Sequence, residues 1–143
     1  MSFFSDYGIK GEQLALDYYL SLGFILLHKN FQYYQQGTQG RLGEIDLILQ
    51  SQDLRYLVLV ETKANYKADS VLATQRVTRK KLLCLYKTYQ YFVKKNPRYQ
   101  ALPCRFDVAL VLGQTVEIIA NAYSFENLFW QNPWQKIKAL DKM

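Results

Sequence analysis

A short apolar run that ends in charge constrains the fold of this chain more than any other feature. Leu57–Val60 is apolar at all four positions, and Glu61-Thr62-Lys63 follows directly. A strand that is apolar on both faces is usually covered on both sides, so we expect it at the centre of a sheet with helices above and below. Unpaired charges are costly beside such a strand. The acid and the base at its end therefore mark a candidate site.

An earlier stretch of strand length also carries acids, Glu44 and Asp46. If the two strands pair through a turn near Ser51–Asp53, Asp46 and Glu61 converge at one end of the sheet. Residues two apart on a strand share a face, so Lys63 lies beside Glu61. Two carboxylates and an ammonium group predict a site for a hard divalent cation, as used in phosphodiester hydrolysis. The alternative is an ordinary Glu61–Lys63 ion pair where the strand meets solvent.

The hydrophobic pattern predicts an α/β protein with a central mixed β-sheet of about five strands flanked by helices. At 143 residues the length suits one domain, which we expect to span residues 1–124. The aromatic tail, 125–143, is expected to pack on that domain or on a second copy of the chain, and its alternative role is a docking surface for a protein partner. The expected elements are helices from Ser5 or Asp6 to Leu22 and from Ala73 to Lys95, and strands at Phe24–Asn30, Glu44–Gln50, Arg55–Thr62, Cys104–Leu112 and Thr115–Ile119.

Composition favours a cytoplasmic protein with a polyanionic partner; the alternative is that the positive charge serves solubility alone. The net charge is +6 and the isoelectric point is near 9.3, which favours nucleic acid or another polyanion as partner. Cys84 and Cys104 are far apart and read as buried free thiols in a reducing compartment. No apolar run approaches the roughly 18 residues of a membrane span, and no secretory signal is apparent.

The second predicted helix is strongly basic. Lys80, Lys87 and Lys94 recur every seven residues and so lie along one face, away from the apolar stripe. With Arg76 and Lys81 they are candidate contacts to nucleic-acid phosphates. The alternative is a helix face that is simply solvated.

Five segments, in their order and spacing, resemble the YraN-type bacterial family. They are Gly11-Glu12, Gly43–Ile48, Val60–Lys63, Arg105–Val108 and Asn121–Tyr123. That family is assigned to the restriction-endonuclease-like superfamily, whose signature is an acid followed by Asp/Glu-x-Lys. Archaeal Holliday-junction resolvases are similar members. The resemblance covers most of the chain.

The resemblance implies a restriction-endonuclease-like fold and assigns roles to single residues. Asp46 and Glu61 would ligate magnesium or manganese, and Lys63 would orient the attacking water and stabilise the anionic phosphorane. Glu12 matches a helix glutamate that reaches the metal. On a helical wheel Glu12 falls beside the apolar stripe, although a solvated glutamate that complements the helix dipole is the alternative.

Two further positions match polar residues of the family, Gln75 as a site candidate and Lys81 as a phosphate contact. The chain departs from the pattern after Lys63, where Ala64-Asn65 replaces the usual Thr-Arg. Together these features predict a magnesium- or manganese-dependent nuclease that acts on DNA or RNA, including structured or branched forms. The alternative is a nucleic-acid-binding protein of the same fold that does not cleave.

Overall fold

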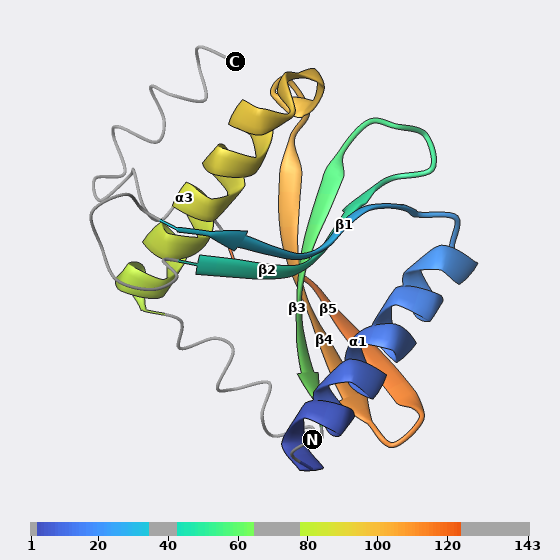
Figure 1. Ribbon diagram of the computed structural model, residues 1–143. Helices are drawn as coiled ribbons and strands as arrows, with labels where there is room; N and C mark the ends of the chain where they lie inside the picture. Colours follow the sequence, from blue (N-terminus) through green and yellow to red (C-terminus); the bar gives the residue numbers. More distant parts are fainter. Residues whose placement is uncertain (1–2, 35–42, 65–77, 124–143) are drawn as a thin grey trace, which may run out of the picture.

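The computed structural model describes residues 3–34, 43–64 and 78–123, and it contains one five-stranded sheet with a helix on each face (Figure 1). In chain order the elements are α1 (Phe3–Ser21), β1 (Ile25–Tyr33), β2 (Gly43–Gln50), β3 (Leu57–Ala64), α3 (Arg79–Lys95), the 3-10 turn η2 (Pro97–Tyr99), β4 (Cys104–Leu112) and β5 (Thr115–Tyr123). The predicted α/β class and mixed sheet are confirmed, and the described residues form a single domain.

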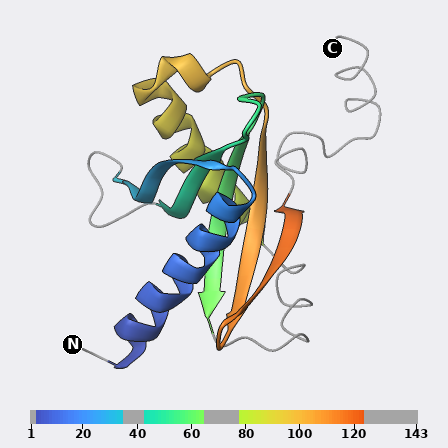
Figure 2. The ribbon, with the colours of Figure 1, turned by 90° about the vertical axis from the view of Figure 1, so that its right-hand side faces the viewer.

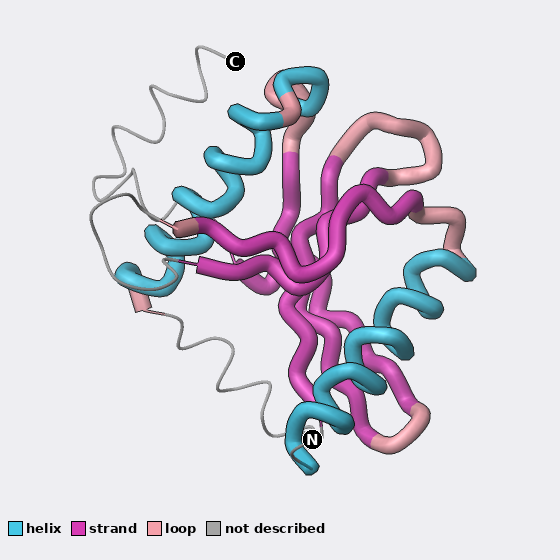
Figure 3. The backbone as a smooth tube through the Cα atoms, in the orientation of Figure 1, coloured by secondary structure: helices cyan, strands magenta, loops and turns pink. Residues whose placement is uncertain are grey.

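The strands follow one another across the sheet in the order β1-β2-β3-β4-β5, so β3 lies in the middle (Figure 3). The β3–β4 pair is parallel and the other three pairs are antiparallel. All four residues of Leu57–Val60 are 0% exposed. The central position predicted from their apolar character is therefore confirmed.

The two helices cover opposite faces of the sheet, with α1 in front of it and α3 behind it in Figure 2. Successive residues of β3 point into opposite layers, which explains why its apolar run does not alternate with polar residues. The α1 layer contains Ala15, Leu16, Tyr19, Leu47, Leu49, Val58, Val60 and Ala109. The α3 layer includes Leu82, Leu85, Phe92, Ile48, Leu57, Leu59, Phe106 and Val108.

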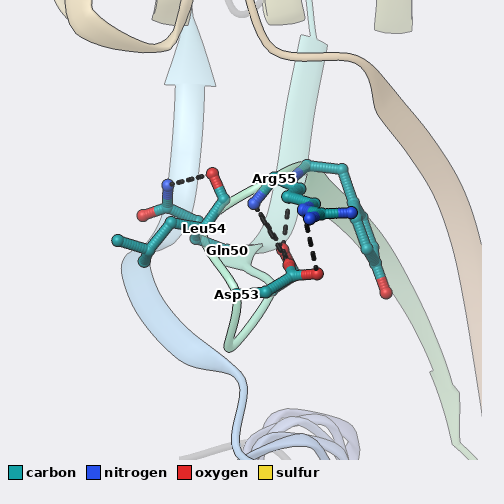
Figure 4. Close-up of polar contacts among 6 residues, drawn as sticks. Gln50, Asp53, Leu54 and Arg55 are labelled. Carbon is teal, nitrogen blue, oxygen red and sulfur yellow. Dashed lines mark hydrogen bonds and ion pairs between the residues drawn. The ribbon is translucent and has the colours of Figure 1, made fainter.

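The turn between β2 and β3 fixes the register of the two acidic strands (Figure 4). The buried Ser51 hydroxyl donates to Asp53 Oδ1 at 2.7 Å and accepts from the Arg55 amide at 3.0 Å. Gln50 Nε2 donates to the carbonyl of Leu54, which has a positive φ of 64°. Asp and Ser commonly stabilise turns in this way, so the predicted turn at Ser51–Asp53 is confirmed.

Several element boundaries differ from the prediction, among them the start of α3 and the ends of β1 and β5. Helix α3 begins at Arg79 rather than at Ala73, because Thr78 is extended and its hydroxyl caps the helix by accepting from the Lys81 amide at 3.1 Å. Strand β1 continues to Tyr33, and β5 continues to Tyr123 beyond an irregularity in its pairing. Position-by-position propensity does not reveal such extensions, because pairing with the neighbouring strand stabilises them.

A buried carboxylate joins α1 to the far side of the sheet. Asp107, which is 0% exposed, accepts from the Tyr19 hydroxyl at 2.8 Å and from Arg105 Nε at 2.9 Å. Its Oδ1 also accepts from the Asn121 amide at 2.9 Å. A buried charge requires such partners, so the Arg105–Val108 segment has a structural role in holding α1 and β5 in place.

The remaining sequence predictions concern the cysteines, membrane spans and the tail. Cys84 and Cys104 are free, partly buried thiols. Within the described part of the chain, no helix is long and apolar enough to cross a membrane. The tail, 125–143, lies outside the described residues, so its packing stays a prediction.

Candidate active site

The acidic residues lie where β2 and β3 separate. The ladder between these strands ends at the pair Leu47–Val60. Beyond this pair β2 turns toward α3, whereas β3 continues alongside α1 (Figure 1). Asp46 and Glu61 are the first residues past the last pair, one on each strand. We call this place the fork. The two acids thus lie at the same end of the β2–β3 pair, as predicted.

Asp46 bridges the fork with its side chain. Its Oδ2 accepts from the Thr62 amide at 2.8 Å and from the Thr62 hydroxyl at 2.9 Å. Burial raises the pKa of Asp46, the two Thr62 hydrogen bonds oppose that rise, and the charges of Glu44 and Glu61 add to it. The carboxylate is thus oriented by two donors from one residue of β3.

Glu61 lies on the other branch of the fork and faces the α3 layer. Its Oε1 accepts from Lys81 Nζ at 3.1 Å, and its Oε2 accepts from the Tyr123 hydroxyl at 3.1 Å. The side chain is 26% exposed. Both carboxylate oxygens are therefore held by groups from other elements, α3 and β5.

Lys63 follows Glu61 on the same side of β3. The parallel ladder with β4 is regular here, pairing Glu61 with Val108 and Lys63 with Leu110. Regular pairing preserves the alternation of side chains, so Glu61 and Lys63 share a face as predicted. Lys63 is partly buried. Glu61 forms an ion pair with Lys81, at 3.1 Å between Nζ and Oε1.

Glu12 reaches the same region from α1. Burial is the main cause that raises its pKa, the charge of Asp46 is the next, and a hydrogen bond with Asn30 opposes the rise. Asn30 lies opposite Asp46, between the pairs Lys29–Leu47 and Phe31–Ile45 of the β1–β2 ladder. Glu44 also raises the pKa of Glu12. The helix glutamate is therefore partly buried beside the fork, not solvated away from it.

The basic residues of α3 divide into two groups. Lys80, Lys87 and Lys94 are exposed, as the seven-residue spacing predicted. Lys81 instead points to the fork and pairs with Glu61. Arg76 and Gln75 lie outside the described residues, so their roles stay predictions.

The sequence did not reveal three residues that orient the acids. Thr62 holds Asp46, Asn30 contacts Glu12, and Tyr123 holds Glu61. Thr62 could have been found, because it lies between Glu61 and Lys63 and can turn its amide toward the neighbouring strand. Tyr123 could not be placed, because β5 was predicted to end before it.

Comparison with known proteins gives the family of this chain. A family model described as "Uncharacterised protein family UPF0102" matches residues 11–111. The chain belongs to this family. The UPF0102 match includes Glu12 and both branches of the fork, whereas Tyr123 lies beyond its end.

Individual UPF0102 proteins are similar over most of their length. The UPF0102 protein of Clostridium botulinum (strain Kyoto / Type A2) is 33% identical over 124 residues, which cover 82% of this chain and 94% of the relative. That of Saccharophagus degradans (strain 2-40) is 36% identical over 120 residues, covering 84% and 94%. The restriction-endonuclease-like superfamily is consistent with the UPF0102 family, and the resemblance seen in the sequence is confirmed at this level.

Proposed function

We propose that this UPF0102 protein is a metal-dependent nuclease that hydrolyses phosphodiester bonds in DNA or RNA. The observation that supports this most is the fork, where Asp46 and Glu61 follow the last β2–β3 pair and Lys63 shares the face of Glu61. A carboxylate pair next to a fixed ammonium group is suited to charge that develops on phosphate oxygens.

The donor chemistry at the fork fits a hard divalent cation. Oxygen ligands suit magnesium and manganese, and magnesium is usually held by one or two protein carboxylates with water completing its shell. Besides burial, the charges of Asp46 and Glu44 raise the pKa of Glu12, and those of Glu44 and Glu61 raise the pKa of Asp46. This indicates excess negative charge that a cation would offset. Within 3–34, 43–64 and 78–123, no three acidic, histidine or cysteine side chains stand close enough to share an ion, so the fit is to a two-carboxylate site.

Each residue of the fork then has a definite task. Asp46 and Glu61 would hold the ion, and Thr62 keeps Asp46 oriented toward the gap between the strands. When bound, the ion supplies a nucleophilic water and charge that stabilises the phosphorane. Lys63 presents a positive charge on the Glu61 side, and Glu12 contributes from α1 at the rim. Positioning and electrostatics of this kind can lower a barrier by several kcal/mol.

The basic face of α3 supports nucleic acid as the substrate. Lys80, Lys87 and Lys94 are exposed on the helix whose first turn also carries Lys81 to the fork. Phosphate contacts position a nucleic acid without reading its sequence, so we expect recognition of backbone and shape.

The test is cleavage of duplex, flap, four-way-junction and single-stranded DNA and RNA with magnesium or manganese. Wild type should cut at least one substrate. Lys63→Ala should abolish cleavage while leaving nucleic-acid affinity within about twofold, because one lysine is a small part of the electrostatic footprint. Glu61→Gln should lose cleavage and metal binding together. Wild type that binds a substrate at micromolar concentration and cuts none would contradict the proposal.

A non-cleaving nucleic-acid-binding protein is the second candidate, and one observation favours it. Both oxygens of Glu61 already have protein donors, Lys81 and Tyr123, which would suit an acid retained for structure. The two candidates differ in metal affinity. A purely structural Glu61 predicts no saturable manganese binding, whereas the nuclease requires it.

A further inference from the structure

Glu61 accepts hydrogen bonds from two groups of different chemistry, and this difference bears on how Glu61 could bind a metal ion. Tyr123 offers a neutral hydroxyl to Oε2, and Lys81 offers a charged ammonium to Oε1, each at 3.1 Å. The ammonium lies 5.8 Å from the centroid of the Tyr123 ring, so the three side chains form one cluster. Neither partner is on the strand that carries the acid.

Tyr123 is fixed in place by the shape of β5. Between the pairs Val108–Ile119 and Phe106–Tyr123, β5 has three residues where β4 has one. A regular ladder would put Asn121 opposite Phe106; instead Asn121 has a positive φ of 53° and donates its amide to Asp107. Bulges of this kind commonly re-aim a side chain next to a functional site.

The ring of Tyr123 is packed so that its hydroxyl has little freedom. The residue is 4% exposed, and its ring centroid lies 5.1 Å from that of Phe106. A hydroxyl held this firmly fixes the orientation of the carboxylate that accepts from it. Groups that orient a metal ligand in this way typically change metal affinity by about 10- to 100-fold.

Lys81 is held less firmly than Tyr123. Its side chain is 40% exposed. It extends from the first turn of α3, where the backbone amide of Lys81 donates to the Thr78 hydroxyl. An ion pair with this exposure is weak, because water screens the charges and the side chain keeps its freedom. Its ammonium occupies one carboxylate oxygen but can leave it at small cost.

We propose that Tyr123 and Lys81 act on Glu61 in opposite directions. Tyr123 is a positioning residue that keeps the carboxylate ready for a divalent cation. Lys81 is an internal counter-cation that competes with that cation for Glu61. This inference rests on the proposed function, since it assumes that Glu61 is a metal ligand.

The test is the affinity of the purified full-length protein for Mn²⁺ alone, measured by calorimetry without nucleic acid. Tyr123→Phe keeps the ring and should weaken Mn²⁺ binding about tenfold or more. Lys81→Met removes the competing charge and should tighten binding about two- to fivefold, the range expected for a partly exposed ion pair.

Two matched variants control for general effects. Tyr89→Phe removes a hydroxyl that is hydrogen-bonded to Cys104 instead, and Lys80→Met removes a charge one position away on an exposed side chain. Both should leave Mn²⁺ affinity within about twofold of wild type. Circular dichroism and melting temperature establish that each variant is folded.

The possible results separate this inference from the proposed function. Saturable binding to wild type, with opposite shifts in Tyr123→Phe and Lys81→Met, supports the inference. Binding to wild type with shifts no larger than those of the controls, or weaker binding in Lys81→Met, overturns the inference alone. Wild type that binds no Mn²⁺ overturns the metal site itself.

Discussion

At the scale of single residues, Asp46 lies where its negative charge is unfavourable without a bound cation. Burial and the neighbouring acids Glu44 and Glu61 raise its pKa, and the two hydrogen bonds from Thr62 only partly oppose them. A carboxyl whose pKa is raised in the folded state binds its proton more tightly there than in the unfolded chain. Ionisation of Asp46 at neutral pH therefore lowers the free energy of unfolding.

Asp46→Asn should consequently raise the melting temperature of the metal-free protein at pH 7. The amide oxygen of asparagine can still accept from the Thr62 amide and hydroxyl, but it carries no charge. As pH falls through the raised pKa, wild type regains the stability lost to ionisation, so the difference between the two proteins should shrink. Thermal melts in chelator between pH 4 and 7 check this. Glu117→Gln, a change on an exposed side chain of β5, should show no gain.

At the scale of elements, the path of β2 toward α3 depends on a glycine at the start of the strand. A Cβ at Gly43 would collide with the Thr88 hydroxyl oxygen and would lie 3.1 Å from the Cys84 carbonyl. The Thr88 hydroxyl donates to that carbonyl at 2.7 Å and is fully buried. No larger residue fits between β2 and α3 without moving one of them. The close approach of Gly43 to Thr88 therefore holds the start of β2 against α3.

Gly43→Ala should lower the free energy of unfolding by about 1–3 kcal/mol, as expected for overpacking. Thr88→Ala removes the nearest atom, so the double variant should recover part of the loss relative to the sum of the single changes. Urea unfolding of the four proteins gives the coupling. Strictly additive losses would show that the two residues are not in contact.

At the scale of the whole molecule, the exposed basic face of α3 should make nucleic-acid binding dependent on salt. Changing Lys80, Lys87 and Lys94 to alanine should lower affinity alike for all sequences. The slope of log affinity against log salt should fall by up to about 0.7–0.9 for each lost phosphate contact. Arg55→Gln, an exposed change at the β2–β3 turn, should leave the slope unchanged. An unaltered slope in the triple variant would mean that the basic face is only solvated.

A feature could be predicted from the sequence when the residues that determine it lie close together along the chain or on paired strands. The central strand, the turn at Ser51–Asp53 and the meeting of Asp46 with Glu61 follow from local pattern and strand pairing. The contacts of Glu61 with Lys81 and Tyr123 do not, because α3 and β5 are brought to the fork by packing between distant segments. The shift in β4–β5 pairing at Asn121 likewise could not be predicted from the sequence. The one hint is the residue type, because asparagine tolerates the positive φ found there.

The most direct measurement of the central claim is a crystal of the protein soaked in manganese, with the ion located by its anomalous signal. We expect one ion at the fork, with a carboxylate oxygen of Asp46 and one of Glu61 each about 2.0–2.2 Å away, and Lys81 moved off Glu61 Oε1. Crystals of Glu61→Gln under the same conditions should show no ion there. A well-ordered wild-type crystal at saturating manganese that has no peak at the fork, with Glu61 still paired to Lys81, would contradict the account.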